Sequence, residues 1–463
     1  MVVGEVPEGL DLLVVGAGPG GYTAALRAAR LGRQVTLVDG DGAAGVGGVC
    51  LRTGCIPSKA LIEMADTVHR AKAWTDTGPV DLARFQSFKE QAVRRLGDAV
   101  RRELDEAGVR ILQGRFCFTR PGQGAVQRDD GGPSGFVEFK DVILATGSRA
   151  VQLGVIREDG GHVVDSAGAL ALDALPSSAA VIGGGYVGVE LGTAFAKLGA
   201  NVAIVEAMDR LLPGMPAAVA RPVRRRLAAL GVQVLLGAQA SGFDGARLKV
   251  ETAQGSAEVE VAVVIVAVGR RPNIDNLGLE LIGIRPGPGG LLEVGKDRRI
   301  APHVAAIGDL TPGPALAHKA MAEAEVAADA LCGRPAVFDP AAIPAVVFGD
   351  PEVAVAGLSD EDARAAGITA RVVAVPLAVS GRAATMGADE GFARLVVDTD
   401  ADAVVGAQIV GPHASELIAE AVLAIEMAAS PTDLAATIHP HPTLSELLAD
   451  AARRASRPNP ALR

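Results

Sequence analysis

The stretch Leu12-Leu13-Val14-Val15-Gly16-Ala17-Gly18-Pro19-Gly20-Gly21 decides the fold of this chain. An apolar strand runs directly into glycines spaced G-x-G-x-x-G, a helical stretch continues to Leu31-Gly32, and a second apolar strand ends at Asp39. This is the complete strand–helix–strand context of a dinucleotide-binding turn. The first glycine allows the tight turn, the second lets the backbone approach a pyrophosphate, and the third lets helix and strand pack closely. The helix N-terminus offers N–H groups to the phosphates, and Asp39 is placed to accept hydrogen bonds from ribose hydroxyls.

A second copy of this pattern occurs in the middle of the chain. Ala180-Val181-Ile182 leads into Gly183-Gly184-Gly185-Tyr186-Val187-Gly188, and the next strand ends at Glu206, 167 residues after Asp39 (206 − 39). One G-x-G-x-x-G alone is a weak signal, because ordinary strand–helix turns also use glycine. Two complete copies predict two dinucleotides, or one dinucleotide and a vestigial site. Glu206 would repel a 2′-phosphate and no arginine directly follows it, which favours NAD over NADP at the second site.

Composition narrows the class of protein. The chain has 463 residues, of which 49% are hydrophobic, and at roughly 150 residues per domain about three domains are expected. A formal net charge of −10 disfavours a nucleic-acid binder, which needs a basic surface. Four cysteines are too few for a disulfide-stapled secreted scaffold. The N-terminus has no basic run, and no uncharged stretch is long enough for a bilayer, so a cytoplasmic protein is expected.

The remainder of the chain predicts further elements. Ala305-Ala306-Ile307-Gly308-Asp309 has the pattern of a buried strand ending in Gly-Asp, followed by a helix from about residue 315 to 331. Beyond Pro340, short strands near 353–355, 372–375, 393–397 and 404–409 alternate with helices near 414–428 and 444–454. This arrangement predicts an α+β domain with antiparallel strands at the C-terminal end.

Two cysteines follow the first acid, in Gly47-Gly48-Val49-Cys50-Leu51-Arg52-Thr53-Gly54-Cys55-Ile56-Pro57-Ser58-Lys59. A zinc site would need two further ligands at similar spacing, and the chain has no second cysteine pair. A structural disulfide that closes so short a loop would constrain little of the unfolded chain. A redox-active dithiol beside a dinucleotide site fits better, and Lys59 is placed to lower the pKa of a thiol electrostatically. The isolated Cys117 and Cys332 are expected to be buried small hydrophobic residues.

A second candidate site lies near the C-terminus, in Ile438-His439-Pro440-His441-Pro442-Thr443-Leu444-Ser445-Glu446. A histidine followed five residues later by a glutamate at a helix start has the spacing of a general base and its orienting carboxylate. The alternative interpretation is a proline-rich turn in which these residues only cap the helix. A dithiol elsewhere in the chain favours the base, because thiol exchange requires a group that takes thiol protons.

Together these motifs closely resemble the flavin-dependent class I pyridine-nucleotide disulfide oxidoreductases, and the resemblance covers nearly the whole chain. Besides the segments already quoted, it rests on Ala145-Thr146-Gly147-Ser148, Val268-Gly269-Arg270-Arg271-Pro272-Asn273, Ile307-Gly308-Asp309 and Pro314-Ala315-Leu316-Ala317-His318-Lys319. The two-cysteine motif is the most specific of them, and its Ile-Pro-Ser-Lys ending is similar to that of the lipoamide enzymes rather than of glutathione reductases. The sequence departs from the usual family pattern at Asp39, Arg52-Thr53, Ala150 and Pro440, and none of these departures removes a functional group. No lipoyl-carrying extension is expected before residue 10.

The resemblance implies roles for residues at both cofactor sites. Cys50 is implied as the interchange thiol that faces substrate and Cys55 as the thiol against the flavin, while Lys59 would pair with Glu190 beside the reactive nitrogen of the flavin. The residues implied in binding FAD are Gly16, Gly18, Gly20, Gly21, Asp39, Gly48, Lys59, Gly114, Thr146, Gly147, Asp309 and Ala317. Those implied in binding NAD are Gly183, Gly185, Gly188, Glu206, Ala240 and Gly269, and no metal site is implied.

The resemblance also implies the architecture and the activity. The expected fold is α/β, with two Rossmann-like dinucleotide-binding domains and a C-terminal α+β dimerisation domain. The expected bounds are 1–150 and 271–339 for the FAD domain, 151–270 for the NAD domain, and 340–463 for the interface of a homodimer. His441, oriented by Glu446, would be the base that acts across this interface on the disulfide of the other subunit.

The implied reaction is the reoxidation of dihydrolipoyl groups carried by the acyltransferase of a 2-oxoacid dehydrogenase complex. Electrons would pass through Cys50, Cys55 and FAD to NAD. One alternative is a different NAD(P)H-dependent disulfide reductase of the same family. A second alternative, from another class, is a mainly structural subunit that docks to a complex core.

Overall fold

The computed structural model describes residues 6–40, 45–76, 78, 80–128, 135–159 and 161–456. The chain divides into two compact units, each assembled from three segments. The first unit comprises Met1–Ala60, Ala83–Val151 and Gly269–Asp339. The second unit comprises Leu61–Leu82, Gln152–Val268 and Pro340–Arg463. Each unit contains a sheet with parallel strands together with helices, as the α/β expectation requires, and each also has antiparallel strands.

An eight-stranded sheet forms the centre of the first unit. Its main path runs β17-β18-β6-β1-β2-β3, and β4 and β5 extend it as a hairpin on β6. The strands are β1 Glu8–Val15, β2 Val35–Asp39, β3 Arg110–Gln113, β4 Arg115–Arg120, β5 Gln123–Gln127, β6 Gly135–Leu144, β17 Arg299–Ala301 and β18 Val304–Ala306. β1 pairs in parallel with β2 on one side and with β6 on the other. The last four residues of this central strand are at most 3% exposed, which explains why they are all apolar.

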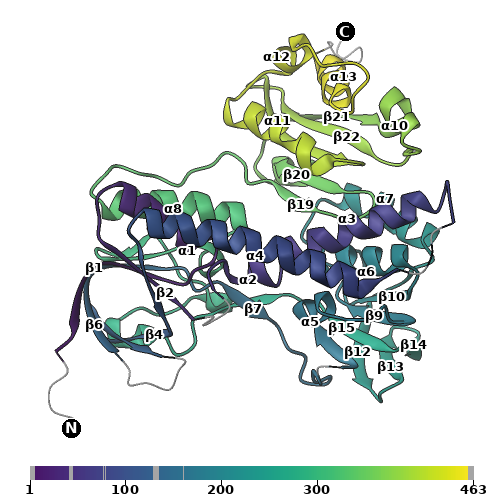
Figure 1. Cartoon of the computed structure of the whole chain (residues 1–463). Coiled ribbons are helices and arrows are strands. Elements are labelled where there is room, and N and C mark those ends of the chain that lie inside the picture. Colours follow the sequence, from purple (N-terminus) through teal and green to yellow (C-terminus); the bar gives the residue numbers. More distant parts are fainter. Residues whose placement is uncertain are drawn as a thin grey trace. The chain divides into compact units, whose positions relative to one another are not determined.

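Helices cover one face of this sheet. They are α1 (Pro19–Arg30), α4 (Leu82–Glu106) and α8 (Ala317–Leu331), and α1 and α8 lie side by side (Figure 1). Alternate side chains of β1 reach opposite faces, so that Leu12 and Val14 enter the core beneath these helices. The alanine-rich sequences of α1 and α8 allow the two helices to approach closely.

Aromatic side chains concentrate on the opposite face. Phe116, Phe118 and Phe139 make edge-on contacts with ring centroids 4.9 to 6.0 Å apart, in a core that also contains Leu13. The single tryptophan of the chain, Trp74, lies outside any core, with 90% of its surface exposed. Aliphatic residues therefore supply most of the buried surface.

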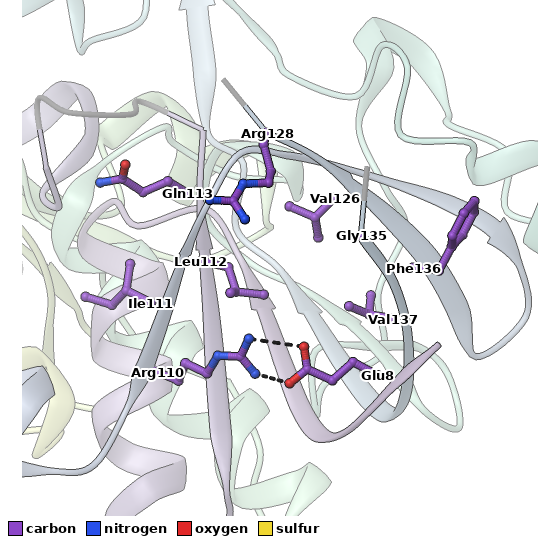
Figure 2. A pocket seen from close by; sticks show the side chains of 10 residues that line it. All are labelled: Glu8, Arg110, Ile111, Leu112, Gln113, Val126, Arg128, Gly135, Phe136 and Val137. Atoms are coloured by element: carbon purple, nitrogen blue, oxygen red, sulfur yellow. Dashed lines mark hydrogen bonds and ion pairs between the residues drawn. The ribbon is translucent and has the colours of Figure 1, made fainter. Parts of the chain in front are cut away.

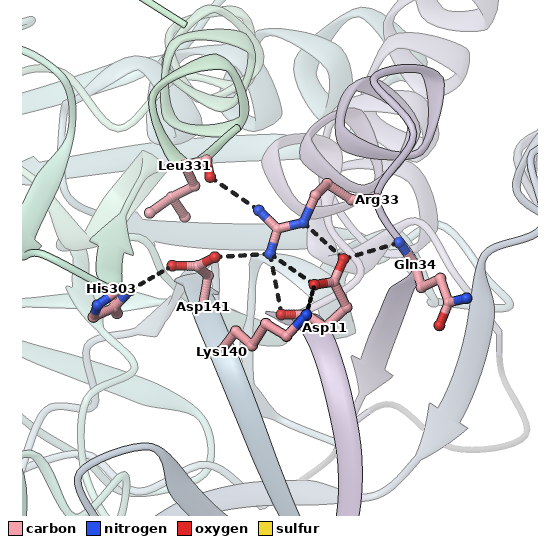
Figure 3. A network of polar contacts seen from close by, with 7 residues as sticks. All are labelled: Asp11, Arg33, Gln34, Lys140, Asp141, His303 and Leu331. Carbon is pink, nitrogen blue, oxygen red and sulfur yellow. Dashed lines mark hydrogen bonds and ion pairs between the residues drawn. The ribbon is translucent and has the colours of Figure 1, made fainter. Parts of the chain in front are cut away.

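A part-buried ion-pair network surrounds Asp11 in the central strand, β1 (Figure 3). Arg33, in the turn between α1 and β2, binds the carboxylates of Asp11 and Asp141 at 2.7 Å each. Its third partner is the carbonyl oxygen of Leu331, at 2.9 Å. One guanidinium therefore joins β1, β6 and the end of α8. The hydrogen bond from Arg33 lowers the pKa of Asp11 to about 2, because it stabilises the ionised carboxylate.

A surface cavity of about 370 Å³ opens at an edge of the same sheet (Figure 2). Apolar side chains such as Leu112 and Val137 line it, together with the ion pair between Glu8 and Arg110. Both charged side chains are 48% exposed, so solvent screens the pair and its contribution to stability is small. None of the predicted site residues is among the residues that line this cavity.

The second unit repeats the central arrangement of the first. Its parallel sheet has the order β11-β10-β9-β15-β8. The strands are β8 Val163–Asp165, β9 Ser178–Ile182, β10 Asn201–Glu206, β11 Gln233–Leu236 and β15 Val263–Val266. Helix α6 (Tyr186–Leu198) follows β9 and precedes β10, just as α1 follows β1 and precedes β2. An antiparallel sheet of β12 Ala238–Phe243, β13 Arg247–Thr252 and β14 Gly255–Glu260 is added to this unit.

The C-terminal part of the second unit contains an antiparallel sheet in the order β19-β20-β23-β22-β21. The strands are β19 Ala345–Val347, β20 Val353–Gly357, β21 Ala370–Pro376, β22 Phe392–Asp398 and β23 Ala403–Val410. Helices α11 Ala414–Glu426, α12 Pro431–Ala436 and α13 Glu446–Ala455 complete it (Figure 1). The predicted α+β arrangement is confirmed, although the last helix begins at Glu446 rather than near 444.

The remaining α-helices are α2 Gly48–Arg52, α3 Cys55–Ala71, α5 Ser166–Leu170, α7 Ala217–Ala229, α9 Asp360–Ala365 and α10 Gly381–Thr385. β7 Ser148–Ala150 and β16 Arg270–Pro272 form an antiparallel pair. Within the described ranges, no helix combines the length and the apolar character that crossing a membrane requires.

Candidate active site

The first glycine turn has the geometry that its sequence predicts. Gly16 has φ +106°, and a Cβ on it would lie 2.3 Å from the carbonyl oxygen of Ala145. A Cβ on Gly21 would lie 1.7 Å from the carbonyl oxygen of Gly16, so only glycine lets α1 pack this closely on the turn. A Cβ on Gly18, in contrast, would meet nothing within 4 Å. The turn therefore encloses open space at its second glycine, where a pyrophosphate fits against the helix N-terminus.

The second glycine turn repeats this geometry. Gly183 has φ +108°, and its Cβ would lie 2.4 Å from the carbonyl oxygen of Ala267. A Cβ on Gly188 would lie 1.9 Å from the carbonyl oxygen of Gly183, and Gly185 again faces open space. Both copies thus fit a dinucleotide, and for the same steric reasons.

The two acids lie at the ends of their strands but have different surroundings. Asp39 ends β2, is 3% exposed, and its carbonyl oxygen accepts the N–H of Gly114 at 2.8 Å. Glu206 ends β10 and is 7% exposed. Its carboxylate accepts the N–H of Gly184 at 2.5 Å and that of Met208 at 2.7 Å. Glu206 is therefore fixed directly against the second glycine turn.

The two-cysteine segment is attached to the first glycine turn. The N–H of Gly47 donates to the carbonyl oxygen of Ala17 at 2.9 Å. Gly48 has φ +57°, and a Cβ on it would lie 2.7 Å from Cα of Gly18. The glycines that precede the first cysteine therefore let its helix, α2, start in contact with the dinucleotide turn.

The cysteine side chains come together because the chain folds back between them. Cys50 lies in α2 and Cys55 begins α3. A Cβ on the intervening Gly54 would lie 2.9 Å from the carbonyl oxygen of Val49, so glycine permits this close return. The side chains of Cys50 and Cys55 are hydrogen-bonded, with Cys50 half-buried and Cys55 exposed.

The pKa of the Cys50 thiol is raised above its usual range. The side-chain hydrogen bond to Cys55 is the largest cause, followed by burial and by the charge of Cys55. Lys59 acts in the opposite direction, as its position in the motif predicts, but it is outweighed. Two thiols this close do not both ionise readily, because the charge of one thiolate raises the pKa of the other thiol.

The two residues predicted to flank the flavin lie in different units. Lys59, in α3, has its Nζ 3.4 Å from the hydroxyl of Ser58, which in turn donates to the carbonyl oxygen of Cys55. Glu190, in α6, is 3% exposed and accepts the N–H of Phe348 at 2.9 Å. Their predicted pairing with each other remains a prediction.

The histidine–glutamate pair near the C-terminus has the predicted contact. Nδ1 of His441 lies 2.9 Å from Oε1 of Glu446, and Oε2 of Glu446 accepts the N–H of Thr443 at 2.9 Å. The N–H of Thr443 and the imidazole of His441 hold the pKa of Glu446 below its usual value. The His441 side chain is 78% exposed. The carboxylate thus orients the ring and leaves the other nitrogen free to face a substrate.

Most of the other residues predicted to bind FAD surround the turn at Gly308. Asp309 is half-exposed, and its carboxylate accepts the hydroxyl of Ser148 at 2.5 Å. Thr146 donates its hydroxyl to the carbonyl oxygen of Asn273 at 2.7 Å. Gly147 has φ +66°. Ala317 is the first residue of α8. Gly20 lies close to Ile307, the residue before Gly308, because a Cβ on Gly20 would be 3.1 Å from the Ile307 side chain.

The last two predicted NAD residues belong to different units, Ala240 to the second and Gly269 to the first. Ala240 is half-buried in β12. Gly269 has φ +122°, and its carbonyl oxygen accepts the N–H of Val151 at 3.0 Å.

The expectation for the two isolated cysteines is only partly correct. Cys117 and Cys332 are half-buried rather than buried. Cys117 lies on the edge hairpin of β4, which has one solvent-facing side, and Cys332 directly follows α8. Burial raises the pKa of Cys332, which keeps it a poor nucleophile.

The sequence interpretation missed Ser148 and Arg270. Arg270 donates from Nε to the hydroxyl of Ser148 at 2.8 Å, and this hydroxyl donates to Asp309. Both residues stand inside motifs that the sequence analysis quoted, so their membership in those motifs was the available signal. The contact itself depends on the pairing of β7 with β16, which sequence spacing does not reveal.

Comparison with known proteins identifies the class. Residues 10–324 match the model for pyridine nucleotide-disulphide oxidoreductases, and residues 343–452 match the dimerisation domain of the same proteins. The chain belongs to the pyridine nucleotide-disulphide oxidoreductase family. The expected class of enzyme, an oxidoreductase that uses FAD and NAD, is thereby confirmed, and the dimerisation domain supports the expected homodimer.

Individual relatives narrow this class. The chain is 44% identical to the dihydrolipoyl dehydrogenase of Halobacterium salinarum, with 98% of each chain covered. It is 43% identical to that of Geobacillus stearothermophilus, covering 98% of this chain and 97% of that protein. LpdA from Mycobacterium tuberculosis has a similar structure, with a TM-score of 0.88 at 29% identity over 96% of this chain and 99% of that one. The HOCl-induced flavoprotein disulfide reductase RclA from Escherichia coli gives 0.85 at 26% identity, over 96% and 99%.

Proposed function

We propose that this chain is a dihydrolipoyl dehydrogenase, which oxidises dihydrolipoyl groups to the lipoyl disulfide and reduces NAD. The observation that carries this proposal is the hydrogen-bonded pair Cys50 and Cys55, attached through Gly47 and Gly48 to the first glycine turn. A dithiol in this position exchanges electron pairs with a thiol substrate on one side and a flavin on the other. The identity of 44% to a dihydrolipoyl dehydrogenase over 98% of the chain supports the substrate class.

In the proposed reaction, the oxidised enzyme carries a disulfide between Cys50 and Cys55. A dihydrolipoyl thiol loses its proton to His441 of the partner subunit, and the resulting thiolate attacks Sγ of Cys50. The enzyme disulfide breaks, and Cys55 leaves as a thiolate with the electron pair. The second dihydrolipoyl thiol then attacks the first dihydrolipoyl sulfur and breaks its bond to Cys50, while its proton passes to the departing Cys50 sulfur. The lipoyl disulfide closes, and the enzyme pair is left reduced by two electrons. When bound, FAD accepts an electron pair from a thiolate and passes a hydride to NAD.

The side chains around the thiols have complementary roles in this proposal. The raised pKa of the Cys50 thiol favours its protonated form, and the hydrogen bond to Cys55 is the largest cause. Glu446 holds Nδ1 of His441, so that Nε2 is the nitrogen that takes the proton. Lys59 and Glu190 are proposed to meet beside the flavin, on the side of its reactive nitrogen.

The two glycine turns are proposed to hold different cofactors. The turn at Gly16 with Asp39 would bind FAD, and the turn at Gly183 with Glu206 would bind NAD. The open space at Gly18 and Gly185 supports a pyrophosphate at each turn. The proposed domains are 1–150 with 271–339 for FAD, 151–270 for NAD and 340–463 for dimerisation.

The proposed partner is a lipoyl-bearing acyltransferase of a 2-oxoacid dehydrogenase complex, and the proposed location is the cytoplasm. The active unit is a homodimer, because the base of one subunit serves the disulfide of the other.

The test begins with the purified protein. It should be yellow, with flavin absorbance, and should reduce NAD when dihydrolipoamide is added. A colourless protein that cannot be reconstituted with FAD, or a yellow protein inactive with dihydrolipoamide, contradicts the proposal.

A second candidate is a disulfide reductase that runs in the opposite direction and uses NADH. The structural similarity to RclA, a flavoprotein disulfide reductase, supports this second candidate. A panel of lipoamide, glutathione disulfide and mycothiol disulfide as oxidants separates the two. Preference for lipoamide supports the first proposal, and preference for either of the others supports the second.

A further inference from the structure

Helix α8 contains two buried charged residues that the proposed chemistry does not use. The side chains of Lys319 and Glu323 are 1% and 0% exposed, and their Nζ and Oε2 atoms lie 3.3 Å apart. The helix around them is rich in alanine. Burial lowers the pKa of Lys319, and Glu323 opposes this shift. A buried ion pair overcomes the desolvation penalty only when further hydrogen bonds satisfy both charged groups. The groups that make these hydrogen bonds therefore indicate which part of the fold the ion pair stabilises.

These partners belong to the turn that carries Asp309. Oε2 of Glu323 accepts the N–H of Gly308 at 2.7 Å, while Nζ of Lys319 donates to the carbonyl oxygen of Gly308 at 3.0 Å. Lys319 also donates to the hydroxyl of Thr311 at 2.8 Å. The pair therefore binds both polar groups of Gly308 and the residue that closes the turn.

The conformation of this turn requires such support. Gly308 has φ +71°, and the short 3₁₀ helix η4 (Gly308–Leu310) starts from it. Gly308 and Leu310 are buried, whereas Asp309 between them is half-exposed. The ion pair therefore fixes the backbone on both sides of a carboxylate that points out of the core, while Ser148 fixes the carboxylate itself.

We propose that Lys319 and Glu323 are positioning residues for FAD, which set the Gly308–Thr311 turn so that Asp309 is presented to the ribityl chain of the flavin. This inference rests on the proposed role of Asp309 at the FAD site. Neither residue touches the cofactor in this scheme. Their effect passes through the backbone of the turn.

The structure also indicates which variant keeps its fold. Arg298 donates to Oε1 of Glu323 at 2.9 Å, so Glu323 retains a cationic partner when Lys319 is replaced. Lys319→Met keeps an unbranched side chain that ends one atom earlier, and it removes the charge and the donors. Lys296→Met is the matched control, because Lys296 lies in the same unit and pairs with Asp339 at the surface, both side chains being 69% exposed.

The experiment compares two thermal transitions of the holoenzyme: the release of flavin, followed by its fluorescence, and unfolding, followed by far-UV circular dichroism. In Lys319→Met, flavin release should shift to a lower temperature than unfolding, and the rate of FAD dissociation should rise about tenfold, as expected for losing charge-assisted hydrogen bonds. In Lys296→Met, flavin release and unfolding should still occur at the same temperature. A Lys319→Met enzyme whose two transitions stay together, or whose FAD dissociates at the wild-type rate, overturns the proposal.

A second pair of variants protects the test against misfolding. Thr311→Val removes the hydroxyl that receives the Lys319 hydrogen bond, and Thr311→Ser retains it. Faster FAD dissociation in the valine variant and a wild-type rate in the serine variant support the proposal, while equal rates contradict it. If these tests fail, only the positioning role of Lys319 and Glu323 is refuted, and the proposed dihydrolipoyl dehydrogenase function stands. Wild-type protein that binds no FAD would refute the proposed function itself.

Discussion

The two glycine turns have nearly the same backbone and different neighbours. Gly16 and Gly183 differ by 2° in φ (106° and 108°), and both would place a Cβ against the carbonyl oxygen of an alanine that directly follows a neighbouring strand. The first turn, however, is contacted by Gly47 and Gly48, which precede the reactive pair. The second turn is closed by Glu206, which binds the N–H of Gly184. The fold repeats a binding device, and the segment packed against each copy decides whether that copy also performs chemistry.

The largest effect is expected when the reactive group beside the first turn is removed. Cys50→Ser should lower turnover with dihydrolipoamide by roughly 10⁴-fold or more, because a hydroxyl cannot form the mixed disulfide. Flavin should remain bound, since the glycine turn is untouched, and visible absorbance measures this. Cys117→Ser is the control and should keep wild-type turnover. A Cys50→Ser enzyme that retains turnover would remove the reason to place the chemistry at this turn.

The next prediction tests whether the two turns bind different cofactors. A methyl group at Gly18 or at Gly185 enters the open space of its turn, because nothing lies within 4 Å of either position. Gly18→Ala should weaken FAD retention by roughly tenfold or more, while Gly185→Ala should retain FAD and raise KM for NAD by a similar factor. Flavin content after gel filtration and steady-state kinetics measure the two effects.

Gly9→Ala, at a surface position of β1 with equal space around its Cβ, serves as the control for that pair. It should change neither flavin content nor KM. The comparison fails if the two turn variants lose the same cofactor.

A smaller effect concerns the acid of the second turn. Glu206→Arg should shift the ratio of kcat/KM for NADP over NAD by about tenfold or more, because the guanidinium attracts a 2′-phosphate that the carboxylate repels. The loss of its bonds to Gly184 and Met208 should also raise KM for NAD. Glu260→Arg, at an exposed position of the same unit, should leave the ratio unchanged. An unaltered ratio in Glu206→Arg would show that the ribose binds elsewhere.

The smallest effect is expected at Asp11, a residue of β1 that precedes the first glycine turn and belongs to neither turn. The pKa of Asp11 is lowered to about 2 in the folded chain, below the value of about 3.9 for an unfolded aspartate. Its contribution to stability is therefore complete above the unfolded pKa and is lost as pH falls from about 4 towards 2. Asp11→Asn should be less stable near pH 6 and should lose less stability between pH 5 and pH 3. The urea midpoints of both proteins at these pH values measure the loss of stability. Equal losses in wild type and Asp11→Asn would contradict the lowered pKa of Asp11.

The sequence was sufficient for features whose signal is local. The glycine turns, their terminal acids and the pair His441–Glu446 are each set by spacing within one strand–helix or turn–helix segment, and the structure has them as expected. The order of the elements and the class of the C-terminal domain were also predictable, because strand and helix periods differ.

Contacts between distant segments were not predictable in this way. Ser148 meets Asp309 across 161 positions of sequence, and the turn at Gly308 is held by Lys319 and Glu323 from another element. The pKa of Cys50 was also missed, since its direction depends on a balance between hydrogen bonding and the charge of Lys59. Such balances are decided by distances of a few tenths of an ångström, which spacing along the chain does not specify.

The position of Trp74 determines how this protein should be observed in solution. Its indole is the only one in the chain and is 90% exposed in the native state. Its emission wavelength is therefore already that of a hydrated indole, and unfolding should shift it very little. Intrinsic fluorescence of the folded protein reports one surface point rather than the state of any core, and a quencher added to the solvent should reach it at once.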